Sequence, residues 1–93
     1  MTRVDPAVAY ARRAGVNAVD MDGELVMMGL EQGEYYGLRG TAASIWGYLE
    51  QASDVQTLAS RLAEEYDVEV DRCRPDVVRF LDDLLRRGLV EPA

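Results

Sequence analysis

The chain has 93 residues, of which 48% are hydrophobic, and this length predicts a single domain with a modest core. Its formal net charge of −7 disfavours contact with the phosphates of nucleic acids, and it contains no histidine and one cysteine. These counts exclude a cysteine–histidine zinc site, a nucleophile activated by histidine and a disulfide within the chain, and they favour the reducing cytoplasm.

The first 15 residues have no decisive pattern. Asp5-Pro6 can begin a short helix that Gly15 ends, but Arg12 and Arg13 leave such a helix poorly amphipathic. We therefore expect residues 1–15 to form an N-terminal arm, either helical or irregular, ahead of a single domain over residues 16–90.

The first part of that domain predicts a three-stranded antiparallel sheet. Val16 to Met21 favours a strand, and Asp22-Gly23 is a strong hairpin turn because both residues tolerate positive φ. Leu25 to Leu30 is apolar on both faces, as a central strand would be. After a turn at Glu31-Gln32-Gly33, a third strand ends at Leu38, and we expect no later strand to pair with it.

Two adjacent tyrosines occupy this third predicted strand, between Gly33 and Gly37. Because side chains alternate along a strand, Tyr36 and Leu38 share one face, while Tyr35 and Gly37 share the other. An unpaired edge is a hazard unless it is covered or used. We interpret this edge as a site for an added peptide strand.

Two predicted helices follow the sheet. Thr41 is expected to cap the first, which runs to about Gln51, and Ser53 is expected to open a capping box for the second, which ends at about Tyr66. A link of two or three residues joins them, as in a helix-turn-helix. Their apolar positions keep a period of 3.6 residues and comprise Ile45, Trp46 and Leu49 in the first helix and Val55, Leu58, Ala59 and Leu62 in the second.

A third predicted helix begins between Asp71 and Pro75 and ends at Arg87, with Gly88 as its stop. It carries more apolar side chains than one core face needs. We expect Val77, Leu81, Leu84 and, as a further candidate, Leu85 to face the core, Val78 or Phe80 to face a groove, Arg79 to pair with Asp83, and Leu89 and Val90 to pack back after Gly88.

Together these elements predict an α+β fold of winged helix-turn-helix-like type, in which a three-stranded antiparallel sheet precedes three helices. Several segments occur in a characteristic order, namely Asp22-Gly23-Glu24-Leu25-Val26, Gly33-Glu34-Tyr35-Tyr36-Gly37-Leu38, Gly40-Thr41-Ala42-Ala43 with Ile45-Trp46, Leu62 to Tyr66, Asp76-Val77 with Phe80-Leu81, and Leu84 with Gly88-Leu89. Together they resemble the PqqD-like proteins over roughly residues 16 to 90.

The resemblance implies a non-catalytic element that binds the leader of a ribosomally made, modified precursor peptide. In that family the leader adds as a strand to the third strand of the sheet and lies against the third helix. The Tyr-Tyr strand and the Ile-Trp helix look most like stand-alone members from lasso-peptide pathways, which hand the leader to a separate leader peptidase or other modifying enzyme. The peptide-binding residues implied here are Glu34, Tyr35, Tyr36, Gly37, Leu38, Val77, Phe80, Leu81, Asp83, Leu84 and Arg87. From the residues themselves, Arg79, Arg86 and Arg87 are the cationic candidates for contact with an acidic leader.

The sequence also admits a winged-helix DNA-binding regulator, which its negative charge opposes, and a small acyl carrier protein. A carrier needs a serine after an aspartate at a helix start, whereas Ser53 precedes Asp54.

Neighbouring helical carboxylates such as Asp82-Asp83 or Glu64-Glu65 diverge by about 100°, so we expect solvated faces and no catalytic residues, metal or cofactor. No apolar run approaches the ~20 residues of a membrane span, so we expect no membrane partner.

Overall fold

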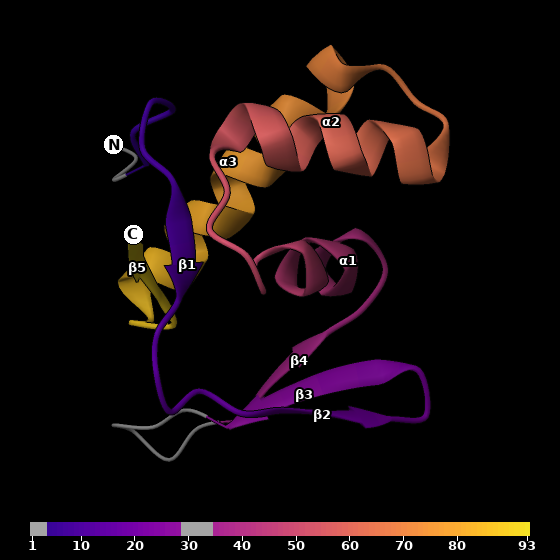
Figure 1. Cartoon of the computed structure of the whole chain (residues 1–93). Coiled ribbons are helices and arrows are strands. Elements are labelled where there is room, and N and C mark those ends of the chain that lie inside the picture. Colours follow the sequence, from indigo (N-terminus) through magenta and orange to yellow (C-terminus); the bar gives the residue numbers. More distant parts are fainter. Residues whose placement is uncertain (1–3, 29–34) are drawn as a thin grey trace.

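The computed structural model describes residues 4–28 and 35–93. The elements follow in the order β1 (Tyr10–Arg12), β2 (Ala18–Met21), β3 (Glu24–Met28), β4 (Tyr35–Leu38), α1 (Thr41–Tyr48), α2 (Val55–Tyr66), α3 (Val70–Arg86) and β5 (Val90–Pro92). Figure 1 shows the sheet β2–β4 at one end of the molecule, the three helices above it, and β1 and β5 beside the C-terminal part of α3. The predicted α+β fold, with a three-stranded antiparallel sheet followed by three helices, is confirmed.

The sheet has the order β2-β3-β4, so β3 is the central strand as predicted. Asp22 and Gly23 form the predicted turn with φ of 54° and 83°, values that suit a tight hairpin with right-handed strand twist. Asp20 supports the turn, because its Oδ1 accepts a hydrogen bond from Gly23 N at 3.3 Å. The predicted end of the second strand at Leu30 and the turn at residues 31–33 lie outside the described residues.

The caps of the first two helices differ from those predicted. Thr41 is the first helical residue of α1, and its N-cap is Gly40, which adopts a positive φ of 58°. Asp54 rather than Ser53 caps α2, because its Oδ1 accepts a hydrogen bond from Thr57 N at 2.8 Å. That hydrogen bond also lowers the pKa of the Asp54 carboxyl. Ser53 is buried instead, and its hydroxyl donates to Gln51 O.

The third helix begins at Val70, slightly earlier than predicted, and contains Pro75. Gly88 ends it as predicted, with a φ of 73° that suits glycine. Leu89 N then donates to Leu84 O at 2.9 Å, which satisfies one carbonyl of the last turn. Leu89 and Val90 are buried, which confirms that the chain packs back after the glycine.

The two ends of the described chain form a second, two-stranded sheet that the sequence did not predict. β1 pairs with β5 in antiparallel register from Tyr10↔Pro92 to Arg12↔Val90. Tyr10 also exchanges two backbone hydrogen bonds of 2.9 Å with Ser53, and its side chain is only 2% exposed. The expectation of a helical or irregular segment is therefore wrong over Tyr10–Arg12. A strand does follow Leu38, but it pairs with β1, so among the described residues no later strand pairs with β4, as predicted. Strands of three residues show no usable alternation, and their formation depends on partners distant in sequence.

The core lies between the sheet β2–β4 and the helices. Trp46 is 1% exposed, which confirms its predicted core position. The other fully buried large side chains come from β3, from all three helices and from the residue that follows α1, and they include Met27, Ile45, Leu49, Val55, Leu58, Leu62, Val77, Leu81 and Leu84. Among the described helices, none is long and apolar enough to cross a membrane.

Candidate functional site

The strand β4 lies at an edge of its sheet. In a two-residue hairpin, the residues that flank the turn exchange both ladder hydrogen bonds, and these residues are Met21 and Glu24. Bonded and non-bonded pairs alternate along an antiparallel ladder. Leu25 and Met27 therefore direct their backbone groups from β3 toward β4.

The partners of these two residues in β4 are Leu38 and Tyr36. It follows that Tyr35 and Gly37 direct their backbone N–H and C=O groups away from β3, toward the outer edge of β4. Within the described residues no strand pairs with this edge. It can therefore offer two donors and two acceptors to an added strand.

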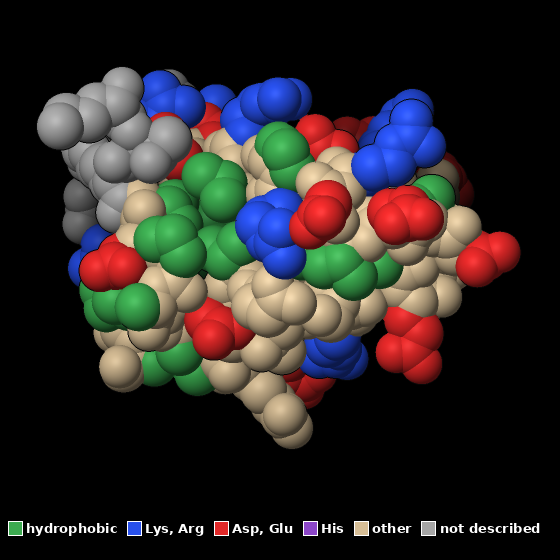
Figure 2. Space-filling view, turned by 90° about the horizontal axis from the view of Figure 1, so that it is seen from above, with side chains coloured by type: hydrophobic (Ala, Val, Ile, Leu, Met, Phe, Trp, Pro, Cys, Tyr) green, Lys and Arg blue, Asp and Glu red, His purple; other side chains and the backbone are tan. Residues whose placement is uncertain are grey.

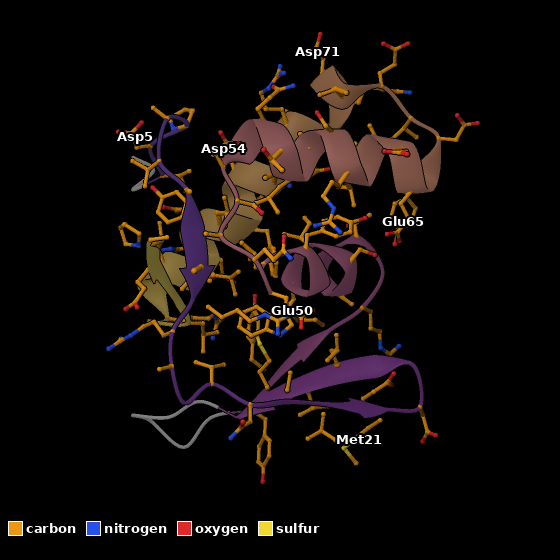
Figure 3. The ribbon with its side chains drawn as sticks, in the orientation of Figure 1. Asp5, Met21, Glu50, Asp54, Glu65 and Asp71 are labelled. Atoms are coloured by element: carbon orange, nitrogen blue, oxygen red, sulfur yellow. The ribbon has the colours of Figure 1, made fainter. Side chains whose placement is uncertain are left out.

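The side chains of β4 alternate as predicted. Leu38 is buried and Tyr36 is half-buried on the face toward the helices, whereas Tyr35 is 75% exposed and Gly37 is exposed on the outer face. Met21 also belongs to the outer face, and Figure 3 shows its side chain directed away from the helices. A strand added beside β4 would place alternate side chains on these two faces.

A polar cluster joins β4 to α3. The Tyr36 hydroxyl donates a hydrogen bond to Asp83 Oδ2, and Arg87 Nε lies 3.2 Å from the same carboxylate oxygen. The Arg87 guanidinium carbon also lies 4.2 Å from the centre of the Tyr36 ring. Burial, together with the hydrogen bond and charge of Asp83, raises the pKa of Tyr36 to about 12. Phe80, one helical turn before Asp83, is half-buried against the core.

The predicted site residues on α3 thus fall into two groups. Phe80, Asp83 and Arg87 lie on the side of the helix that Tyr36 contacts. Val77, Leu81 and Leu84 are completely buried, so their side chains belong to the core and do not reach solvent. Leu38 on β4 is likewise buried, with 3% of its surface exposed. The last predicted residue, Glu34, lies outside the described part of the chain.

Two pairings differ from the sequence-based expectation. Arg79 lies 3.7 Å from Asp76 rather than pairing with Asp83, whose carboxylate is engaged by Tyr36 and Arg87. Glu65 is not simply solvated, because it accepts hydrogen bonds from the hydroxyls of Tyr48 and Ser44 on α1. The Tyr48 hydrogen bond is the main cause of the lowered pKa of Glu65. These contacts tie α1 to α2 (Figure 3), on the other side of α1 from the sheet.

Sequence reasoning also missed a pair on the outer face of the sheet. Glu24 Oε2 accepts hydrogen bonds from Arg39 Nη2 at 2.8 Å and Arg39 Nε at 3.1 Å. Glu24 Oε1 lies over Gly37, where it would overlap a Cβ atom placed on that glycine. Only the strand register brings these residues together, so the sequence held no signal for them.

Other surfaces give weaker indications of a site. A shallow hollow at the α2–α3 connection, lined by Asp67, Val68, Glu69, Val70 and Arg72, lies at the opposite end of the molecule from β4 (Figure 1). Among the described residues, no group of three metal-ligating side chains is placed to hold an ion. Figure 2 shows acidic and basic side chains interspersed on the face seen from above, with no continuous basic patch among the described residues there.

Comparison with known proteins identifies the family. Residues 24–90 match the family model described as coenzyme PQQ synthesis protein D (PqqD). No curated protein matches the chain. Among solved structures, TbiB1 in complex with the TbiA(beta) leader peptide is 27% identical, with a TM-score of 0.77 over 87% of this chain and 94% of that chain.

Two further structures are similar. A lasso peptide synthetase B1 complexed with its leader peptide is 26% identical, with a TM-score of 0.76 over 89% of this chain and 98% of that chain. The PqqD part of Methylobacterium extorquens PqqCD, described as a stand-alone RiPP recognition element, has a TM-score of 0.80 over 97% of this chain and 96% of that chain. At 16% identity it supports the fold alone. Because the family model covers most of its length, the chain belongs to the PqqD family.

Proposed function

We propose that this protein is a non-catalytic adaptor, a RiPP recognition element, that binds the leader region of a ribosomally made precursor peptide. The observation that carries the proposal is the outer edge of β4, with which no strand of the described residues pairs, and its link to α3 through Tyr36 and Asp83. Two similar structures are complexes with leader peptides, which supports the same class of ligand for this chain.

In this proposal the leader adds to β4 as a further strand of the domain formed by residues 16–90. Its backbone hydrogen-bonds to Tyr35 and Gly37, whose edge groups face outward. Its inward side chains lie beside Tyr36 and reach Phe80, Asp83 and Arg87 on α3. Leu38 lies at one end of the paired segment, and Val77, Leu81 and Leu84 support α3 from the core.

The adaptor would present the bound leader to a separate enzyme in the cytoplasm. A leader peptidase or other modifying enzyme of a lasso-peptide pathway fits the similarity to a lasso peptide synthetase B1 protein. The net charge of −7 and the comparisons give no support to a winged-helix DNA-binding regulator. A mobility-shift assay with duplex DNA at low salt is expected to show no complex.

Proline substitutions test the strand addition, because proline removes one backbone donor. The probe is the TbiA(beta) leader peptide carrying a fluorescent label, and binding is measured by anisotropy. Tyr35→Pro removes an outward N–H and is expected to weaken binding by about 1 kcal/mol while the domain stays folded. Tyr36→Pro instead removes a ladder hydrogen bond to Met27 and is expected to disrupt the sheet, which circular dichroism detects.

Tyr35→Ala is the matched control, because it removes the side chain and keeps the N–H. It is expected to bind more tightly than Tyr35→Pro. Phe80→Ala, which removes apolar surface from α3, is expected to weaken binding by about 1–3 kcal/mol. If folded Tyr35→Pro and Phe80→Ala proteins both bound the leader like the wild type, the strand-addition proposal would be wrong.

A further inference from the structure

We propose that Glu24 selects a long cationic side chain, lysine or arginine, at the one leader position that lies beside Gly37. The inference rests on the proposed function, because it requires a peptide strand on the outer edge of β4. It adds to that function a specificity-determining residue on the face of the sheet opposite to α3.

The first observation is that the Glu24 carboxylate lies over Gly37. This residue lies on the outer face of β4, and its lack of a side chain leaves room that Glu24 Oε1 occupies. A strand that pairs with β4 runs about 5 Å away, and its residue beside Gly37 points to the same outer face. A lysine or arginine at that position can therefore extend across the bare backbone of Gly37 and reach Oε1.

The second observation is the orientation of the Glu24 carboxylate. Arg39 donates both of its hydrogen bonds to Oε2, at 2.8 and 3.1 Å. Within the described residues, no donor contacts Oε1, so this oxygen has acceptor capacity directed over Gly37. Arg39 thus holds the carboxylate in place and leaves one oxygen for a ligand.

The more buried member of the Glu24–Arg39 pair determines whether a cationic or an anionic side chain binds there. The Glu24 side chain is 32% exposed, whereas the Arg39 side chain is 79% exposed and already paired. A leader carboxylate beside Gly37 would meet the fixed Glu24 oxygen at close range and would be repelled. A leader lysine or arginine would instead complete the hydrogen bonding of Oε1.

Tyr35 and the charge of the whole chain favour the same ligand. Tyr35 lies two residues before Gly37 on the same face and is 75% exposed, so its ring can pack against an aliphatic stem or a cationic head. The net charge of −7 adds a general attraction for a cationic segment. The predicted ligand is therefore long, cationic and partly apolar.

A positional scan of the leader tests the inference. Each position of the TbiA(beta) leader peptide is replaced in turn by alanine, lysine and glutamate, and binding is measured by fluorescence anisotropy. With the wild-type protein, one position is expected to favour lysine over glutamate by roughly three- to tenfold, as for a partly exposed ion pair. Glu24→Gln is expected to abolish this preference, and Glu24→Lys to reverse it.

Two further variants separate the local effect from a general one. Glu64→Gln changes the net charge equally but lies on α2, so the lysine preference is expected to persist. Gly37→Ala would displace Glu24 Oε1 and is expected to reduce the preference. Circular dichroism measures whether each variant is folded. If Glu24→Lys does not fold, the comparison of wild type with Glu24→Gln, which has a side chain of the same shape, decides the test.

The failure of this inference differs from failure of the proposed function. If the leader binds and no position changes its lysine-to-glutamate preference in Glu24→Gln, then Glu24 has no selective role and the adaptor function stands. If the TbiA(beta) leader does not bind, peptides selected on the protein from a displayed random library are scanned instead. If no peptide binds at all, the adaptor function is wrong and the inference falls with it.

Discussion

At the scale of single residues, arginine side chains cover three partly or fully buried aromatic rings. Each guanidinium carbon lies 4.2 to 4.7 Å from a ring centre, as in cation–π contacts. For both tyrosines the phenol also donates a hydrogen bond to a carboxylate, so the polar tip is satisfied while the ring is buried. The pairs are Arg12 with Trp46, Arg61 with Tyr48, and Arg87 with Tyr36.

The first prediction concerns the ionisation of Tyr36. Burial and then the Asp83 contact raise its pKa from 10.0 to about 12, so the folded state favours the neutral phenol. The resulting stabilisation is complete below pH 10 and is lost as the pH rises through about 12. The measurement is phenolate absorbance during an alkaline titration. In Tyr36→Phe, one tyrosine that ionises late in the wild-type titration is expected to be missing. In Asp83→Asn that group should ionise earlier, and an unchanged titration in both variants would contradict the assignment.

The second prediction concerns Arg12, whose Nε and Nη2 both donate to the carbonyl of Trp46 near the end of α1. Arg12→Lys keeps the charge but loses the planar pair of donors and the stacking on the indole. The free energy of unfolding is therefore expected to fall by about 1–2 kcal/mol. Urea denaturation followed by Trp46 fluorescence measures it. A control variant, Arg79→Lys, alters an exposed arginine and is expected to change stability by less than about 0.5 kcal/mol.

At the scale of elements, β1 attaches the N-terminal segment to the rest of the domain. It pairs with β5, and its residue Tyr10 forms backbone hydrogen bonds with Ser53. Tyr10 is the anchor, because its ring is buried and its hydroxyl accepts a hydrogen bond from Asp5 N at 2.9 Å. The segment is thus part of the core rather than a loose extension.

The third prediction follows from this anchor. Tyr10→Ala is expected to lower the free energy of unfolding by about 3–5 kcal/mol, as for other buried aromatic side chains. Chemical denaturation measures the change. Tyr35→Ala removes the same side chain from an exposed position and is expected to change stability by no more than about 0.5 kcal/mol. A Tyr10→Ala protein as stable as wild type would show that β1 contributes little.

Local sequence signals predicted some elements well and could not predict others. The turn at Asp22-Gly23 and the helix stop at Gly88 need positive φ, and glycine or aspartate at those positions carries the signal in the sequence itself. β1, by contrast, contains Arg12, which no hydrophobic pattern marks as half-buried, because its partner Trp46 lies 34 residues away. The site divides in the same way. The faces of β4 followed from alternation, whereas the Tyr36–Asp83 contact spans 47 residues and needed the fold.

At the scale of the whole molecule, the sheet β2–β4 projects from the helical body and meets it on one face only (Figure 1). Met27 and Leu38 bury their side chains against the helices, and Tyr36 adds the polar contact to α3. The outer face retains exposed apolar side chains at Val19, Met21 and Tyr35. Within residues 4–28 and 35–93 no strand pairs with the outer edge of β4, while the inner face of this strand packs against the core.

The fourth prediction concerns the salt dependence of leader binding. Backbone hydrogen bonds and apolar contacts to Phe80 are expected to dominate the affinity, with one ion pair at most beside Gly37. The dissociation constant is therefore expected to change by less than about tenfold between about 50 and 200 mM salt, far below the ~10³-fold loss of a protein with many phosphate contacts. Anisotropy titrations in both salts measure the change, and a loss near ~10³-fold would indicate a mainly electrostatic site.

The pairing of Tyr10 with Pro92 also has a kinetic consequence, because almost the whole chain lies within the loop that it closes. Closing so long a loop costs chain entropy. The contacts that offset this cost become available only after the hairpin and the helices have formed. The β1–β5 sheet is therefore expected to form after the folding transition state and to open before global unfolding. In stopped-flow experiments Tyr10→Ala should speed unfolding and leave the folding rate nearly unchanged, with a φ-value near zero.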